Sequence, residues 1–463
     1  MRTEFKIFLT IWIIYVLFLS DYGGNYMAES MLDATIALVD NGNFEIDDYV
    51  REECKITGCD HSFYNGKIYS GYAPGGSMIA VPLYAVAKPF LELFLPESFN
   101  GYSKTRLKII VFNALAGVFI TAVLSACIAV LIYKLLEHMS FSKKSCLWVT
   151  FLFAFGTLFF TYSTAYFNRV NVSFFLFLSF YLLYLMKIGK MKKTKSSLFL
   201  LGILSSSAIT IEYSTVLVVS LLFLYLISFF RNKKIIYYIL GSIIPLLLLM
   251  SYHYAIYDNP ISSSYQYHKN INGQDAVAEN ELKIPDFEHL WGVSFSPEKG
   301  YFFFIPFMFV SVLGLFKGLK EKKFMSELLL IMSIFIVMFI FNASLSESWK
   351  GNCAFGPRYL LVTIPFMIIP SIFLIKNLFV KILGILSVFI NSLPVLYLRT
   401  NGCDLPNSIF QRYLPTLFEK GLSNYTLNLI DLKLFKISLL YQNLIMIVSL
   451  TIIGLIIYFI WKK

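Results

Sequence analysis

The sequence predicts an all-α integral membrane protein with about twelve transmembrane helices. Of its 463 residues, 57% are hydrophobic and only 14% are charged. The mean hydropathy is +0.68, which lies well outside the range of soluble globular proteins. Apolar windows recur along the whole chain, and short runs of lysine and arginine separate them. The net charge of +11 therefore reports orientation in a membrane and not nucleic-acid binding.

The apolar windows are long enough for membrane spans. The first reads as a retained helix and not a signal peptide, because no small-residue cleavage site follows it. The fifth is too long for one span and carries the polar segment TIEYS at its midpoint, so we divide it at Glu212. The windows fall near residues 5–20, 106–135, 145–161, 170–186, 197–230, 235–256, 300–317, 325–342, 359–375, 382–398 and 441–461.

The basic clusters set the orientation of these spans, because loops rich in lysine and arginine stay in the cytoplasm. All clusters share that side only if residues 75–97 do not cross the membrane. This segment contains two prolines and Lys88, so we expect it to be an interfacial or re-entrant helix. The large polar stretches then face the extracytoplasmic side, at residues 21–105, 257–299, 343–358 and 399–440.

The first outer loop, residues 21–105, holds the candidate catalytic acids. Asp21 follows the first span directly, and Glu29 and Asp33 are spaced one helical turn apart. One interpretation is a solvated acidic helix. The other is a carboxylate that removes a proton from an acceptor hydroxyl.

Four cysteines are also predicted outside the cytoplasm, where disulfides persist. They predict one or two disulfide bonds, and their pairing does not follow from the sequence. These cysteines are Cys54, Cys59, Cys353 and Cys403.

Several charged residues are predicted at the outer membrane boundary. Glu212 lies between two apolar half-segments, where a carboxylate is costly unless it has a function or a partner. A structural ion pair with Arg169 or Arg358 is the alternative. Arg358, which follows Gly356 and Pro357, suits bidentate binding of a phosphate, although an interfacial arginine can also extend to ordinary lipid phosphates. Lys299 adds a further cation on this face.

An ordered set of motifs runs along nearly the whole chain. It comprises ALVDNGNFEID, FYNGKIYSGYAPGGSMIAVPLYAV, TYSTAYFNRVN, LSSSAITIEYS, YAIYDNPISSSYQY, LWGVSFSPEKGYFFFIPFMFVSVLGL and FGPRYLLVTIPF. The set resembles prokaryotic multi-spanning proteins of the GT-C glycosyltransferase type. These are related broadly to protein O-mannosyltransferases and lipid A aminoarabinose transferases. The resemblance implies one GT-C-like transmembrane domain over residues 1–463.

The resemblance also implies an activity. Such enzymes transfer a sugar from a dolichyl- or undecaprenyl-phosphate monosaccharide to a glycan, lipid or protein acceptor outside the cytoplasm. An acidic residue soon after the first span serves as the base. Asp21 matches that role best by position, whereas Glu29 lies nearer the loop pattern of this group, and the sequence does not separate them. We expect a metal-free enzyme without a cofactor, since no metal-binding motif is present.

The chain departs from its relatives at one motif. Many of them carry YSDKAPG where this chain has YSGYAPG, so that Gly71 and Tyr72 replace an acid and a base. This shifts the expected donor-phosphate contacts to three cations, Arg358, Lys299 and Arg169. We assign pocket or orienting roles to Glu212, Tyr213, Tyr72 and Tyr265.

The expected chemistry is a one-step displacement at the anomeric carbon, with a carboxylate as base and the lipid phosphate as leaving group. Two other classes remain open. A transporter or flippase of a lipid-linked sugar would need internal repeats and mid-membrane polar residues, which the sequence does not show convincingly. A non-catalytic assembly subunit is the third.

Overall fold

The computed structural model describes residues 2–19, 26–51, 54, 59–99, 101–269, 282–351, 354–396, 405–422 and 439–462. These residues fall into two compact units, and the chain passes between them several times. Unit 1 comprises residues 1–21, 117–174 and 282–463, and unit 2 comprises residues 22–116 and 175–281. That the two units form the single domain expected from the sequence stays a prediction.

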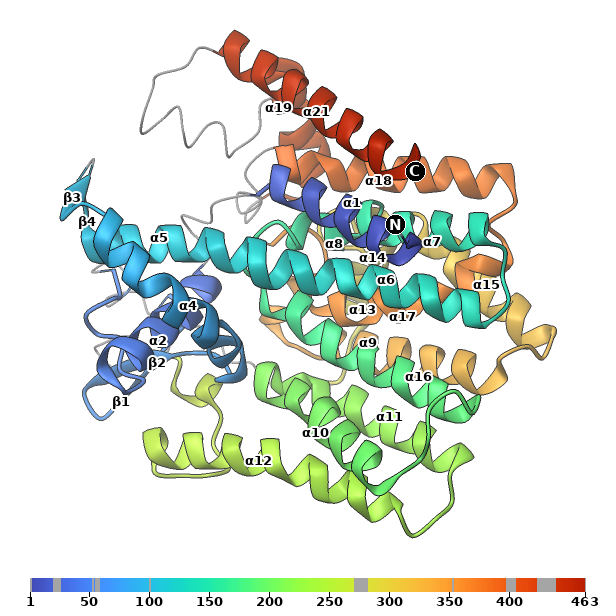
Figure 1. The fold of residues 1–463 in the computed structure, drawn as a ribbon, viewed down its shortest axis with the longest axis horizontal. Coiled ribbons are helices and arrows are strands. Elements are labelled where there is room, and N and C mark those ends of the chain that lie inside the picture. The colour runs from blue at the N-terminus through green and yellow to red at the C-terminus, as the bar shows by residue number, and fades with distance from the viewer. Residues whose placement is uncertain are drawn as a thin grey trace. The chain divides into compact units, whose positions relative to one another are not determined.

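Unit 1 is built from helices. Its first helix, α1, packs along α6. The helix α7 follows α6 after a short turn and packs against it (Figure 1). The helix α21 lies against α1, where the Trp461 indole donates a hydrogen bond to the Thr10 hydroxyl at 2.9 Å. The α-helices are α1 (Thr3–Leu17), α6 (Ala122–His138), α7 (Lys143–Phe155), α8 (Leu158–Tyr162), α13 (Phe287–Ser294), α14 (Tyr301–Phe304), α15 (Met308–Lys320), α16 (Met325–Ala343), α17 (Ile364–Met367), α18 (Leu378–Leu396), α19 (Leu414–Lys420) and α21 (Leu439–Lys462).

Short 3₁₀ and π segments complete unit 1, and one of them carries a predicted site residue, Arg358. They include η4 (Glu347–Lys350) and η5 (Arg358–Thr363), and η5 leads directly into α17. The others are η1 (Gly117–Thr121), η6 (Ile369–Phe373) and η7 (Ile409–Tyr413). The helix α9 (Asn168–Lys187) begins in unit 1 and continues into unit 2 after Phe174.

Unit 2 contains the strands as well as helices. Its two hairpins are antiparallel, with β1 paired to β2 and β3 paired to β4. The elements are α2 (Tyr26–Asn41), β1 (His61–Tyr64), β2 (Lys67–Ser70), α4 (Gly75–Phe94), β3 (Ser98–Phe99), β4 (Tyr102–Ser103), α5 (Lys104–Ala116), α10 (Lys195–Ile211), η2 (Tyr213–Thr215), α11 (Val216–Phe229), α12 (Ile235–Tyr257) and η3 (Ser264–Tyr267).

The helices α10 and α12 lie side by side in unit 2 (Figure 1). They approach closely at Gly202, where an added Cβ would lie 2.0 Å from the Tyr238 carbonyl oxygen. The helix α10 ends at Ile211, and Glu212 leaves it with extended backbone angles before η2 and α11 begin. The predicted division of this long apolar window at Glu212 is therefore confirmed.

Seven helical segments in the described residues are long and apolar enough to cross a membrane. Together with the dominance of helix, they confirm the predicted all-α membrane protein. The segment Gly75–Phe94 is one of them, and it continues as a helix through Pro82 and Pro89. Its interfacial placement stays a prediction. The others are Lys104–His138, Asn168–Lys187, Ile235–Tyr257, Met325–Ala343, Leu378–Leu396 and Asn443–Lys462.

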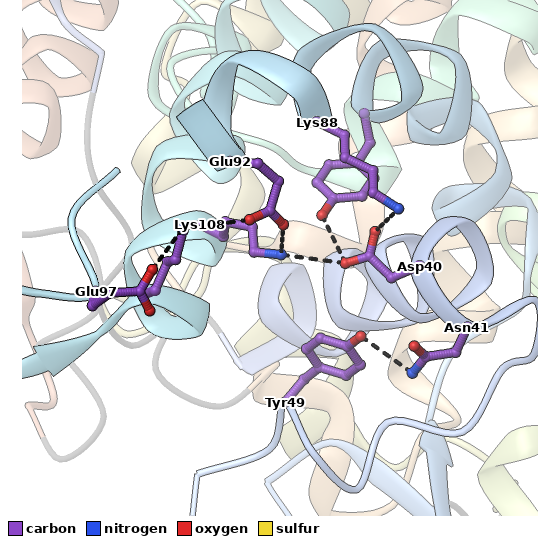
Figure 2. Close-up of polar contacts among 9 residues, drawn as sticks. Asp40, Asn41, Tyr49, Lys88, Glu92, Glu97 and Lys108 are labelled. Atoms are coloured by element: carbon purple, nitrogen blue, oxygen red, sulfur yellow. Dashed lines mark hydrogen bonds and ion pairs between the residues drawn. The ribbon is translucent and has the colours of Figure 1, made fainter. Parts of the chain in front are cut away.

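An ion-pair network joins α2, α4 and α5 within unit 2. The Asp40 carboxylate, in the last turn of α2, pairs with Lys88 of α4 at 2.8 Å and with Lys108 of α5 at 3.3 Å (Figure 2). Lys108 also pairs with Glu92 of α4 at 2.5 Å. These contacts link the two charged residues of α4 to α2 and α5 and give Lys88 a partner in a mainly apolar helix.

A disulfide bond closes the segment before the first hairpin. It joins Cys54 and Cys59, whose Cα atoms are 4.9 Å apart. One of the predicted bonds is thus present, with its pairing now assigned. The other two predicted outer cysteines, Cys353 and Cys403, lie outside the described residues.

Candidate active site

Glu29 is held in place by two arginines of unit 2. It lies in the first turn of α2 and is 5% exposed. Arg106 of α5 donates two hydrogen bonds to its carboxylate, at 2.7 and 3.0 Å, and Arg51 donates a third at 2.5 Å. Such bidentate pairing is among the strongest polar contacts available to a carboxylate. Glu29 therefore joins α2, α5 and the loop that follows α2.

Asp33 lies one turn further along α2 and is 2% exposed. Burial raises the pKa of its carboxyl well above the ordinary value, and the Glu29 charge adds to this, while Arg106 and Arg51 act in the opposite direction. The interpretation of α2 as a solvated acidic helix is wrong, since both acids are buried. Asp21, the other predicted base, lies outside the described residues.

We predict that Glu29→Gln lowers the thermal stability of the protein. Removing one partner of a buried ion pair leaves uncompensated charge and costs about 3 kcal/mol or more. Glu97→Gln is the matched control, because the Glu97 side chain is 87% exposed and its pair with Lys104 lies at the surface. Melting curves of the purified variants in detergent check the difference. Equal melting temperatures for both variants would contradict this anchoring role.

The turn at Glu212 gathers polar and aromatic side chains within unit 2. The Tyr213 hydroxyl lies 2.8 Å from His253 Nε2 and 3.2 Å from the Ser264 hydroxyl. The Tyr265 hydroxyl donates to Glu212 Oε1 at 3.5 Å. Glu212 itself is 5% exposed. Its predicted pairing with an arginine of unit 1 stays a prediction.

Aromatic rings connect this turn to the YSGYAPG motif. The Tyr265 ring packs edge-on against Tyr213 at 5.6 Å and against Tyr72 at 6.0 Å, measured between ring centroids. It also contacts the His268 imidazole at 5.2 Å. The structure thus brings together the predicted pocket residues Tyr72, Glu212, Tyr213 and Tyr265. We call this group, with His268, the tyrosine cluster.

The predicted phosphate-binding cations belong to unit 1. The guanidinium carbons of Arg169 and Arg358 lie 4.4 and 5.4 Å from the centroid of the Tyr359 ring. Arg169 comes from the first turn of α9 and Arg358 from η5, so Tyr359 holds two cations from distant parts of the sequence together. The structure therefore groups both predicted arginines.

Lys299 lies in the same unit and is 3% exposed. Its ammonium donates a hydrogen bond to the Ala354 carbonyl oxygen. Burial lowers the pKa of Lys299 to about 7. The positive charges of Arg358 and Lys350 lower this pKa further, whereas the negative charge of Glu298 raises it. Lys350 forms an ion pair with Glu298 at 3.1 Å. Lys299 is thus a buried amine whose charge changes near neutral pH.

The match to a known family covers the middle of the chain. Residues 103–255 match the family model of dolichyl-phosphate-mannose-protein mannosyltransferases. This is a glycosyltransferase family of the GT-C type. The predicted resemblance is confirmed over this segment. No curated protein matches the chain.

The glycosyltransferase-like segment runs from β4 to the last turns of α12 and includes Arg169, Glu212 and Tyr213. Within the described residues, no group of three or more histidine, cysteine, aspartate or glutamate side chains is placed to hold a metal ion. Metal independence stays a prediction.

Sequence reasoning missed several residues of these sites. Arg51 and Arg106 were not assigned, although their partner Glu29 was, because their pairing spans 22 and 77 positions of the chain. The sequence alone assigns no role to His253 or His268. The one available signal for His268 was its position three residues after Tyr265 within an aromatic-rich loop.

Proposed function

We propose that this protein is a membrane glycosyltransferase that moves a monosaccharide from a polyprenyl-phosphate sugar to an acceptor outside the cytoplasm. The observation that carries the proposal is the match of residues 103–255 to a family that uses dolichyl-phosphate mannose. The disulfide between Cys54 and Cys59 supports an extracytoplasmic first loop, because disulfides persist in oxidising compartments.

The reaction is a single displacement at the anomeric carbon. An acceptor hydroxyl oxygen forms the new bond to this carbon while the bond to the phosphate oxygen breaks, which inverts the configuration. A carboxylate accepts the hydroxyl proton, and the polyprenyl phosphate leaves with the bonding electron pair. Cations at the phosphate stabilise the charge that develops on it.

Asp21 is the proposed base. Glu29 accepts three hydrogen bonds from Arg51 and Arg106, so its lone pairs are engaged in holding α2 in place. A base must instead have a lone pair directed at the acceptor hydroxyl. This supports assigning proton transfer to Asp21 and an anchoring role to Glu29.

Arg169, Arg358 and Lys299 are the proposed phosphate ligands. Both guanidinium groups lie over the Tyr359 ring, at 4.4 and 5.4 Å from its centroid, and guanidinium groups bind phosphate oxygens bidentately. The buried Lys299 is close enough to Arg358 for that charge to lower its pKa. An incoming phosphate would relieve the repulsion between these cations.

We predict that affinity for polyprenyl phosphate falls as the pH rises above about 7. The pKa of Lys299 is about 7 in the unliganded protein, so the amine is mainly protonated at pH 6 and mainly neutral at pH 8.5. Only the protonated form attracts the phosphate, and binding should therefore be tighter at the lower pH. Titrations in detergent at both pH values measure this. Lys299→Arg keeps its positive charge at both pH values, so its affinity for polyprenyl phosphate should change little with pH. An equally large fall in affinity in that variant would assign the pH dependence to another group.

A transfer assay tests the proposed function. Purified protein in detergent receives a polyprenyl-phosphate hexose labelled in the sugar, together with acceptor extracts of the cell envelope. Labelled acceptor formed without a sealed bilayer supports the transferase. Activity that requires sealed vesicles and moves the intact donor across them would support the flippase instead, and absence of both activities would support an assembly subunit.

A further inference from the structure

A cavity lies along the first turns of α7 in unit 1. Its volume is about 560 Å³, within the range of about 300–1,000 Å³ that is typical of small-ligand sites. All of its described lining residues come from α7, so the cavity belongs to one unit. None of them takes part in the proposed transfer reaction. They are Lys143, Lys144, Leu147, Trp148 and Phe151.

The lining residues change in character along one face of α7. Residues spaced three or four positions apart lie on the same face of a helix, and the lining set from Lys144 to Phe151 follows this spacing. The two lysines stand at the start of the helix, and the apolar side chains follow them. At a rise of about 1.5 Å per residue, Phe151 lies about 12 Å from Lys143 along the helix axis. A ligand that fills the cavity therefore needs a charged end and an apolar end.

The charged end has no ion-pair partner in the described part of the chain. Lys143 and Lys144 are both exposed, and no described carboxylate lies within ion-pair distance of either ammonium group. Glu137, at the end of α6, instead accepts a hydrogen bond from the Tyr133 hydroxyl at 3.4 Å. Adjacent lysines without a carboxylate favour a headgroup with net negative charge over one that carries its own ammonium.

The two ends of the chain lie next to this cavity. The Phe151 ring is 6.1 Å from the Trp461 ring of α21, measured between centroids, and the Lys6 ammonium of α1 lies 5.8 Å from the centroid of the same indole. Figure 1 shows the start of α1 and the end of α21 close together. The basic segments at the start of α1, the start of α7 and the end of α21 are thus neighbours, as expected for segments that share the cytoplasmic headgroup region.

The apolar end of the cavity favours a lipid over a soluble phosphate ester. Leu147 and Phe151 offer a polar ligand no hydrogen-bonding group. Trp148 is 36% exposed, and tryptophan is enriched at the membrane–water interface, where its ring lies at the level of the headgroups. An acyl chain would cover this wall, whereas a free phosphate would contact the lysines alone.

We propose that this cavity binds an anionic phospholipid of the cytoplasmic leaflet. The lipid phosphate pairs with Lys143 and Lys144, and one acyl chain lies along Leu147, Trp148 and Phe151. The bound lipid is a structural ligand of unit 1 and takes no part in sugar transfer. The inference does not rest on the proposed function, because it uses none of the residues assigned to that function.

Fluorescence quenching of the full-length protein in detergent tests this. Phosphatidylglycerol with brominated acyl chains is compared with phosphatidylcholine that carries the same chains, because bromine quenches an indole only at close contact. At equal mole fraction, the anionic lipid should quench more of the tryptophan emission of the wild-type protein. Trp148→Phe should remove this difference, since it removes the indole that faces the proposed site.

A double variant tests the charged end. Lys143→Gln combined with Lys144→Gln should raise the phosphatidylglycerol concentration at half-maximal quenching about tenfold, because two cations near the lipid phosphate are lost. The matched control is Lys320→Gln combined with Lys376→Gln, which removes two exposed lysines from the same unit. This control should leave the quenching curve unchanged.

Several results would overturn the inference and leave the proposed function intact. One is equal quenching by the two brominated lipids in the wild-type protein, which requires no variant to fold. Another is a preference for phosphatidylglycerol that persists in Trp148→Phe or in the double lysine variant. Loss of the preference on adding inorganic phosphate at constant ionic strength would identify a site for free anions instead of a lipid. A dimer in detergent that Trp148→Arg dissociates would place a second copy of the chain on this face.

Discussion

Asp21→Asn is expected to reduce the rate of sugar transfer by about 10²- to 10⁴-fold, the usual contribution of a positioned general base. The amide is nearly the same size as the carboxylate but does not accept the acceptor's proton. Donor affinity and melting temperature should stay near the wild-type values, since the change removes no phosphate contact. Initial rates with labelled donor, alongside binding titrations and melting curves, give all three quantities.

Glu29→Gln provides the comparison for this experiment. Loss of stability in Glu29→Gln, together with loss of turnover in a stable Asp21→Asn, is the expected pattern. A fully active Asp21→Asn combined with a stable but inactive Glu29→Gln would transfer the role of base to Glu29.

Arg358→Ala is expected to weaken binding of polyprenyl phosphate by roughly 10- to 100-fold, which corresponds to the 1.5–3 kcal/mol of a hydrogen bond to a charged group. The Arg358 guanidinium lies over the Tyr359 ring, as that of Arg169 does, so its removal takes one of three cations from the proposed phosphate site. Titration with polyprenyl phosphate in detergent measures the change directly.

Lys376→Ala is the matched control for this variant, because it removes an exposed cation from the same unit. It should leave the affinity unchanged, which would exclude a general effect of lowered positive charge. Equal affinity of Arg358→Ala and wild type for polyprenyl phosphate would remove Arg358 from the proposed site and leave it as a residue of the membrane interface.

The helices were largely predictable because hydrophobicity carries the signal. The window at 106–135 corresponds to the continuous segment Lys104–His138, and the division at Glu212 coincides with the end of α10. A carboxylate between two apolar runs indicates a break, since neither run tolerates it in its interior. The grouping of Tyr72, Tyr213 and Tyr265 around this break followed from placing the polar turns on one side.

The partners of the site residues were not predictable, because they depend on contacts between distant segments. Glu29 was identified as an acid with a possible role, yet its anchoring by Arg106 connects α2 to α5 across 77 positions. The burial of Lys299 is of the same kind: the sequence places it in a polar loop, whereas the fold encloses it beside Arg358. Loops lack the periodicity that reveals the buried side of a helix.

The bridge between Cys54 and Cys59 sets a practical condition on every assay described above. Dithiothreitol or similar thiols in the purification buffers would open a covalent link in the same loop as Glu29. Preparations intended for kinetic work should therefore be made in a host that exports this loop to an oxidising compartment, and should be handled without such additives.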